Sequence, residues 1–108
     1  MGYHDNQKCI DACLQCAAIC NHCASSCLSE QDVEMMTKCV QMDMECAALC
    51  YATAQLLSLG SIHAKAISNI CAEACRACAE VCGNHNNEHC QECAAACRKC
   101  ADECERVQ

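Results

Sequence analysis

Cysteines recur along this chain at intervals of three and four residues, and this spacing is the feature that most constrains its fold. Of the 108 residues, 18 are cysteine, and they fall into four groups: residues 9–27, 39–50, 71–82 and 90–104. In the first, third and fourth groups the two intervals alternate strictly, as they do along one face of an α-helix. In the second group the intervals are 7 and 4, and we expect Met42 to fill the position missing between Cys39 and Cys46.

The residues between these groups predict where the helices begin and end. Gly60 separates the second group from the third, and Gly83 follows the third. Ser29 followed by Asp32 resembles a capping box for the second helix, and Asn86 is a candidate cap for the fourth. We therefore expect four helices, near residues 5–28, 31–59, 62–83 and 87–106. Because short loops force neighbouring helices to run antiparallel, the predicted fold class is all-α, an up-down-up-down four-helix bundle with cysteine stripes facing the core.

The composition agrees with a core that is built from sulfur. Leu, Ile, Val and Phe together number 15, and the hydrophobic fraction of 54% rests instead on 18 Cys and 18 Ala. The chain contains no Phe, Trp or Pro. A content of large aliphatic residues this low is typical of disordered chains, so a folded form needs an unusual interior of thiols and methyl groups. The length suits a single domain over residues 1–108.

The charge pattern argues against nucleic acid and membranes as partners. The formal net charge is −7, and the seven Lys and Arg residues are scattered, so no basic stripe is available to neutralise phosphates. Residues 1–10 show no signal peptide, and the polar residues within 46–64, the longest uncharged stretch, indicate two helix ends and a turn rather than a membrane span. The expected location is the cytoplasm, where thiols stay reduced.

Several uses of so many cysteines can be compared. A purely structural core would pack better with leucine, which does not oxidise. Disulfides between cysteines one turn apart on a helix would strain the preferred dihedral of about 90°, although a thiol-redox role stays open as an alternative. The sequence shows no Ser/His/Asp arrangement and no Gly-rich phosphate loop, so we do not predict an enzyme.

Metal binding fits the pattern best, because thiolate is the soft ligand that selects Cu(I), Zn(II) and iron–sulfur clusters. The compact cysteine run of iron–sulfur proteins is absent. Four thiolates around each Zn(II) would leave uncompensated negative charge inside the bundle. Cu(I) can replace a thiol proton without changing the charge, so we predict multiple Cu(I) ions per chain, approaching one per cysteine. A metallothionein-like zinc or cadmium buffer is the alternative metal function.

The two ends of the predicted bundle differ in composition. One end gathers residues that we expect to form an apolar plug: Leu56, Leu57, Leu59, Ile62, Ile67 and Ile70. The other end gathers thioether and imidazole groups, near Cys27, Cys82 and Cys90, from Met35, Met36, His85 and His89. These groups bind Cu(I) without losing a proton from a buried thiol, so we expect copper to enter there. The pattern leaves open whether Met42 or Asp43 faces the core, and it places His4, His22 and His63 on the surface.

The candidate metal ligands comprise every cysteine together with four other side chains. They are Cys9, Cys13, Cys16, Cys20, Cys23, Cys27, Cys39, Cys46, Cys50, Cys71, Cys75, Cys78, Cys82, Cys90, Cys93, Cys97, Cys100, Cys104, Met35, Met42, His85 and His89.

Three segments resemble the bacterial copper storage proteins, specifically their cytosolic branch: CIDACLQCAAICNHCASSC, CVQMDMECAALC and CAEACRACAEVCGNHNNEHCQECAAACRKCADEC. The resemblance covers nearly the whole chain. It implies a four-helix bundle that stores many Cu(I) ions, limits copper toxicity, holds a copper reserve and assembles as a homotetramer. It also implies His and Met residues near one mouth, as at His85, His89, Met35 and Met36. Copper chaperones or small thiols are the expected exchange partners.

Overall fold

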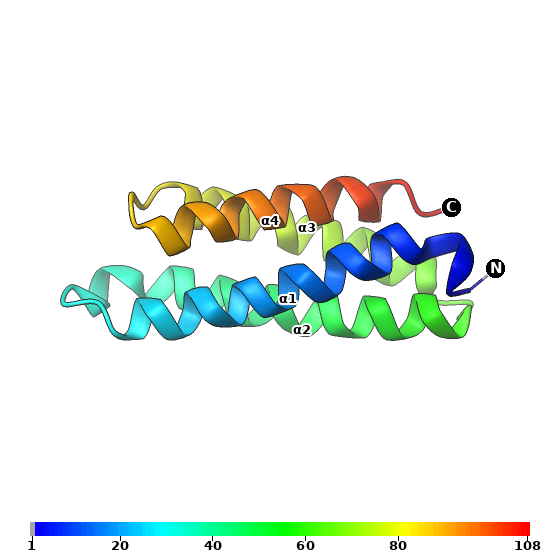
Figure 1. Cartoon of the computed structure of the whole chain (residues 1–108), viewed down its shortest axis with the longest axis horizontal. Coiled ribbons are helices and arrows are strands. Elements are labelled where there is room, and N and C mark those ends of the chain that lie inside the picture. Colours follow the sequence, from blue (N-terminus) through cyan, green and yellow to red (C-terminus); the bar gives the residue numbers. More distant parts are fainter. Residues whose placement is uncertain (1) are drawn as a thin grey trace.

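Four antiparallel helices lie side by side in the computed structural model, which describes residues 2–108 (Figure 1). The helices are α1 (Gln7–Leu28), α2 (Thr37–Leu59), α3 (Ala64–Gly83) and α4 (Glu88–Glu105), with short 3₁₀ helices η1 (His4–Asn6) and η2 (Val33–Met36) before α1 and α2. Each helix packs against the two that flank it: α1 against α2 and α4, and α3 against α2 and α4. The bundle measures 46 × 18 × 17 Å. The all-α, up-down-up-down prediction is therefore confirmed.

The turn between α2 and α3 forms as its glycine predicts. Gly60 follows the last residue of α2 with φ 65°, a left-handed conformation that costs glycine little. Its N–H donates to the carbonyl of Leu57 at 3.1 Å, and the N–H of Ser61 donates to the carbonyl of Leu56 at 3.0 Å. These bonds satisfy two carbonyls that the helix end would otherwise leave without partners.

Two predicted helix caps are wrong. Ser29 caps the end of α1 rather than the start of α2, and its hydroxyl donates to the Ser25 carbonyl at 3.4 Å. The chain then forms η2, so that α2 begins at residue 37 and not near 31. Asn87, not Asn86, directly precedes α4, and its side chain makes no capping hydrogen bond. The local polar pattern is misleading here because the inward register of the cysteines decides where the helices begin.

The core consists of the cysteine stripes and the alanines beside them. No cysteine exposes more than 4% of its surface, and the buried alanines let the helix axes come close. The acidic and basic side chains, apart from Asp43, lie outside this core. No helix within residues 2–108 combines the length and the apolar character that crossing a bilayer requires.

The predicted apolar plug is largely wrong. Of its six residues only Leu57 is buried, in the same core as Ile10 and Val107. The others are half-buried or exposed, and Ile62 exposes 93% of its surface. The physical reason is the narrow cross-section of the bundle, since each helix presents a single inward side chain per level and Leu57 takes that position on α2.

Candidate metal centre

The cysteine sulfurs form a continuous column along the axis of the bundle, which we call the sulfur column. All eighteen are free thiols, and each lies within van der Waals or hydrogen-bonding distance of others. Contacts between different helices recur along its length: Cys9–Cys104 (3.7 Å), Cys13–Cys100 (3.7 Å), Cys46–Cys75 (3.5 Å), Cys20–Cys97 (3.7 Å) and Cys27–Cys90 (3.9 Å). A metal ion bound anywhere in the column therefore has another set of thiols next to it.

Groups of four sulfurs within this column have the compactness of metal sites. In each group the four sulfurs lie within 4.8 Å of one another. Five such groups are Cys13/Cys71/Cys100/Cys104, Cys16/Cys46/Cys50/Cys75, Cys16/Cys20/Cys46/Cys97, Cys20/Cys78/Cys93/Cys97 and Cys23/Cys27/Cys39/Cys90. Several groups share cysteines, so the arrangement is suited to bridging sulfurs and linked ions rather than to separate single-ion sites. The donors are soft, which favours soft metals such as Cu(I).

Asp43, not Met42, occupies the inward position between Cys39 and Cys46. Asp43 is fully buried, whereas Met42 is only partly buried and packs against the edge of the core. The sequence contains the information to decide this. The interval from Cys46 to Cys50 is 4, so strict alternation requires an interval of 3 before Cys46, which gives position 43. The same rule places Met36 three residues before Cys39 on the inward face.

The Asp43 carboxyl is surrounded by thiols. Its Oδ1 accepts hydrogen bonds from Cys93 at 3.1 Å, Cys78 at 3.2 Å and Cys82 at 3.3 Å. Burial, reinforced by the neighbouring Cys93, raises the pKa of Asp43 to about 8. The metal-free core therefore holds this carboxyl in its protonated, uncharged form at neutral pH, so it carries no isolated buried charge.

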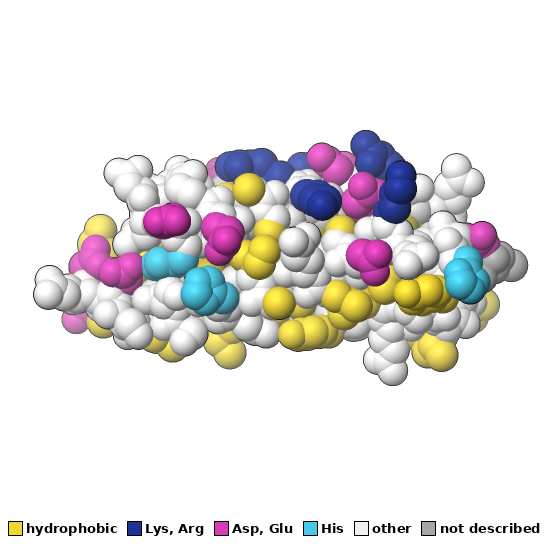
Figure 2. Space-filling view, viewed as in Figure 1, with side chains coloured by type: hydrophobic (Ala, Val, Ile, Leu, Met, Phe, Trp, Pro, Cys, Tyr) yellow, Lys and Arg dark blue, Asp and Glu magenta, His cyan; other side chains and the backbone are white. Residues whose placement is uncertain are grey.

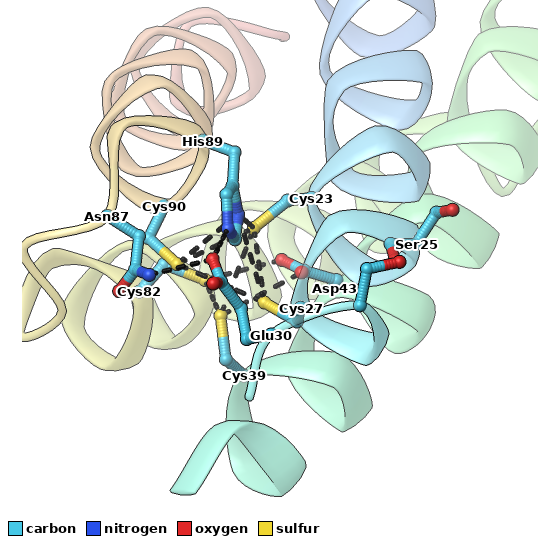
Figure 3. Close-up of polar contacts among 11 residues, drawn as sticks. Cys23, Ser25, Cys27, Glu30, Cys39, Asp43, Cys82, Asn87, His89 and Cys90 are labelled. Carbon is cyan, nitrogen blue, oxygen red and sulfur yellow. Dashed lines mark hydrogen bonds and ion pairs between the residues drawn. The ribbon is translucent and has the colours of Figure 1, made fainter. Parts of the chain in front are cut away.

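His89 lies at one end of the sulfur column, with one ring nitrogen directed at the thiols (Figure 3). Its Nδ1 is 3.5 Å from the sulfurs of Cys23 and Cys90 and 3.9 Å from that of Cys27. Its Nε2 is 2.7 Å from a carboxylate oxygen of Glu30. A carboxylate oxygen only accepts, so Nε2 carries a proton, and in the neutral form of the ring Nδ1 has a lone pair facing the sulfurs.

Glu30 is a positioning residue that the sequence analysis missed. Its carboxylate accepts hydrogen bonds from His89 and, at 2.8 Å, from the Asn87 side chain. These two bonds hold the pKa of Glu30 below its usual value. Burial raises the pKa of the nearby Cys27 thiol and raises that of Cys90 to about 11. Cys27 and Cys90 therefore keep their protons at neutral pH, and the Nδ1 of His89 is the nitrogen that lies beside them.

The other predicted ligands at this end are placed differently. Met35 is 70% exposed and lies on the surface, because Met36 takes the inward position and is buried. His85 is half-buried in the connection between α3 and α4, where its backbone N–H donates to the Cys82 carbonyl at 3.0 Å. The structure brings the ring of His89 to the thiols, and the roles of Met35, Met42 and His85 as ligands stay predictions. His4, His22 and His63 are exposed, as predicted.

The two ends of the bundle differ in charge. Residues 24–38 and 80–94 surround His89 and contain six acids and one base, so this region carries −5 of the total charge of −7. The six acids are Glu30, Asp32, Glu34, Glu80, Glu88 and Glu92, and the base is Lys38. On the face shown in Figure 2, acidic and His side chains lie over this end, and Lys and Arg lie along the middle and the opposite half, where further acidic and His side chains accompany them. An acidic mouth raises the local concentration of cations.

A helix bundle whose interior is a column of free, buried thiols, with an imidazole at one mouth, defines a class of protein that holds soft metal ions inside its fold. The comparison with known families agrees with this class. The sequence model of the copper storage proteins matches residues 3–108, and the chain belongs to this family.

Solved structures of copper storage proteins have the same fold as this chain. The Cu(I)-bound copper storage protein BsCsp3, of Bacillus subtilis, is 39% identical with a TM-score of 0.89, over 93% of this chain and 94% of that one. A cytosolic copper storage protein from Streptomyces lividans with five coppers is 43% identical with a TM-score of 0.89, over 92% and 88% of the two chains. The Streptomyces lividans protein Ccsp loaded with 10 copper equivalents is 44% identical with a TM-score of 0.87, over 90% and 78%.

Proposed function

We propose that this protein takes up many Cu(I) ions into its sulfur column, where they form a copper reserve and are kept from toxic reactions. The observation that carries the proposal is the unbroken column of eighteen free thiols, all buried. Each Cu(I) that binds releases one thiol proton, so the interior stays neutral as ions accumulate. Four thiolates around each Zn(II) would leave excess negative charge, and the core contains no Lys or Arg to offset it. The solved relatives with bound copper support the same choice of metal.

The first test is the capacity of the reduced protein for Cu(I). Titration under anaerobic conditions, followed with a Cu(I) indicator that competes for the metal, is expected to show more than ten ions per chain. Zn(II) is expected to saturate at fewer ions, and Cu(I) should displace it completely, because thiolate sites favour the softer ion. Saturation at one or two Cu(I) ions, or retention of Zn(II), would contradict copper storage.

The second test concerns uptake at the mouth. His89→Ala removes the lone pair that faces Cys23, Cys27 and Cys90, so initial Cu(I) uptake should slow by about tenfold. Glu30→Gln should slow it less, because the ring loses its charged hydrogen-bond partner but not its donor atom. His22→Ala on the exposed face of α1 is the matched control and should load at the wild-type rate. Equal rates for all three variants would show that copper enters elsewhere.

The setting of this storage is also part of the proposal. We place the protein in the cytoplasm, because free thiols survive in a reducing compartment and one of its relatives is a cytosolic protein. We propose a homotetramer, following the family resemblance, with copper chaperones or small thiols as exchange partners. We assign it no catalytic activity, because its thiols lie inside the fold and not in a substrate cleft.

A further inference from the structure

We infer that small anionic thiols withdraw copper at the end of the bundle opposite His89, in a surface cavity where Cys9 is the thiol within reach. We call this the Cys9 end. The inference rests on the proposed storage of Cu(I), and it adds a second port with a different ligand chemistry.

A surface cavity borders the last cysteine of the sulfur column at this end. It has a volume of about 460 Å³ and lies between the start of α1 and the end of α4. Cys9 forms part of its wall and, at 4%, is the most exposed of the eighteen cysteines. The Cys9 sulfur lies 3.7 Å from that of Cys104, which lies 3.7 Å from that of Cys13. A ligand in the cavity therefore lies beside Cys9, the last cysteine of the column.

At the level of Cys9 and Cys104, only two of the four helices contribute a thiol to the sulfur column. Thr53 is three residues beyond Cys50, and Ser68 is three residues before Cys71, so α2 and α3 present hydroxyls where α1 and α4 present Cys9 and Cys104. Both hydroxyls are fully buried, and neither has a hydrogen-bond partner within residues 2–108.

Hydroxyls are hard ligands and compete poorly for Cu(I). At this level a terminal ion meets the thiolates of Cys9 and Cys104, with Cys13 as the next sulfur inward, whereas deeper ions have sets of four sulfurs around them. The terminal ion keeps a coordination position that an external thiol can take. The two unpartnered hydroxyls are also free to donate hydrogen bonds to a sulfur that gains negative charge during exchange.

The charged side chains around this cavity favour an anionic ligand. Lys8, Arg106 and His4 line the cavity together with two acids, Asp5 and Glu103. Arg106 pairs with Glu103 at 3.2 Å, but the Lys8 ammonium has no ion-pair partner in the part of the chain that the structure describes. Residues 2–12, 55–69 and 99–108, which make up the Cys9 end, sum to −1, against −5 around His89. A thiol that carries a carboxylate is therefore repelled from the His89 mouth and accepted at this end.

The exchange step is balanced without electron transfer. The sulfur of the external thiol forms a bond to Cu(I), and the bonds from Cu(I) to the Cys9 and Cys104 sulfurs break. The Cys104 thiolate stays bound to the next ion inward. The proton of the external thiol passes to Cys9, so a neutral thiol is restored in the protein. The metal leaves as a Cu(I)–thiolate complex, and Cys9 is again available to receive an ion from Cys104.

The test uses copper-loaded protein and three small thiols of similar size. The probes are 3-mercaptopropionate (anionic), 2-mercaptoethanol (neutral) and cysteamine (cationic), and the readout is the rate at which copper leaves the protein after rapid desalting. Lys8→Glu should slow removal by 3-mercaptopropionate about fivefold and should speed removal by cysteamine. Each rate is compared with wild type for the same thiol, so intrinsic differences between the thiols cancel. Added salt should reduce the effect of the substitution.

Two further variants make the result decisive. Cys9→Ser should slow removal by all three thiols while lowering the copper content by no more than about one ion. Lys38→Glu, an exposed lysine near the other end, is the matched control and should leave all three rates unchanged. Copper content before thiol addition tests storage itself, since a variant that loads fully has kept that function. Full loading with a Lys8→Glu rate equal to wild type, or with His89→Ala slowing removal more than Cys9→Ser, would overturn the inference.

Discussion

Copper-loaded protein is expected to stay folded in about 6 M guanidinium chloride, whereas the metal-free protein unfolds at a few molar. A ligand that binds only the folded state stabilises it, by about 4 kcal/mol when its free concentration is a thousand times its dissociation constant. Many ions bound in one column multiply this term, because unfolding disperses the thiols of all four helices together. Hydrophobic burial stabilises the metal-free protein much less, because large aliphatic side chains are few and cysteine and alanine bury small areas.

The measurement is far-UV circular dichroism against denaturant, in anaerobic buffer with a phosphine reductant. The midpoint should rise stepwise as Cu(I) is added, and a strong Cu(I) chelator should reverse the change. Protein incubated with Zn(II) serves as the comparison and should shift less. If full copper loading moves the midpoint by less than about 0.5 M, the ions are not holding the helices together, and binding must occur at the surface.

The cysteine intervals predict most of the fold because they repeat the period of the helix. Each stripe continues through positions that are not cysteine: Met36 at the end of η2, Asp43, Thr53 and Leu57 on α2, Ser68 on α3 and Val107 after α4 all keep the same alternation and are all buried. A pattern this regular fixes the inward face of every helix, and short connections then fix the antiparallel order. The alternation therefore predicts the inward positions that hold apolar or polar residues as well as those that hold cysteines.

Details that depend on contacts between helices are not available from the intervals. Glu30 lies in the connection after α1, and its role emerges only when the fold brings it to His89, 59 residues later. The exposure of Ile62 likewise reflects the turn geometry and not its hydrophobicity. The choice between Met42 and Asp43 is decided by the register of the helix, because strict alternation of intervals places position 43 on the inward face.

Asp43 gives the metal-free protein a stability that is expected to fall as the pH rises from about 4 to about 8. Burial raises the pKa of Asp43 from its ordinary value of 3.8 to about 8, so the folded state holds this proton more tightly than the unfolded state does. Below pH 4 both states are protonated, and the stabilisation is complete. Between the two values only the unfolded state ionises, which favours unfolding by about 1.4 kcal/mol per pH unit and by about 6 kcal/mol in all. Above pH 8 the carboxyl is ionised in both states, so the stability no longer changes with pH through Asp43.

Asp43→Asn isolates this effect because it keeps the shape of the side chain and removes the ionisation. Guanidinium midpoints of the two metal-free proteins should agree near pH 4 and diverge by pH 7.5, with the variant the more stable. All residues other than 43 are the same in both proteins, so their contributions cancel in the difference, and Glu73→Gln on the surface of α3 should track wild type throughout. Parallel curves for Asp43→Asn and wild type would mean that the carboxylate is already ionised inside the apo core. The sulfur column would then carry a negative charge before any copper binds, and the first ion would be drawn to Asp43 by charge and not by the softness of the thiols.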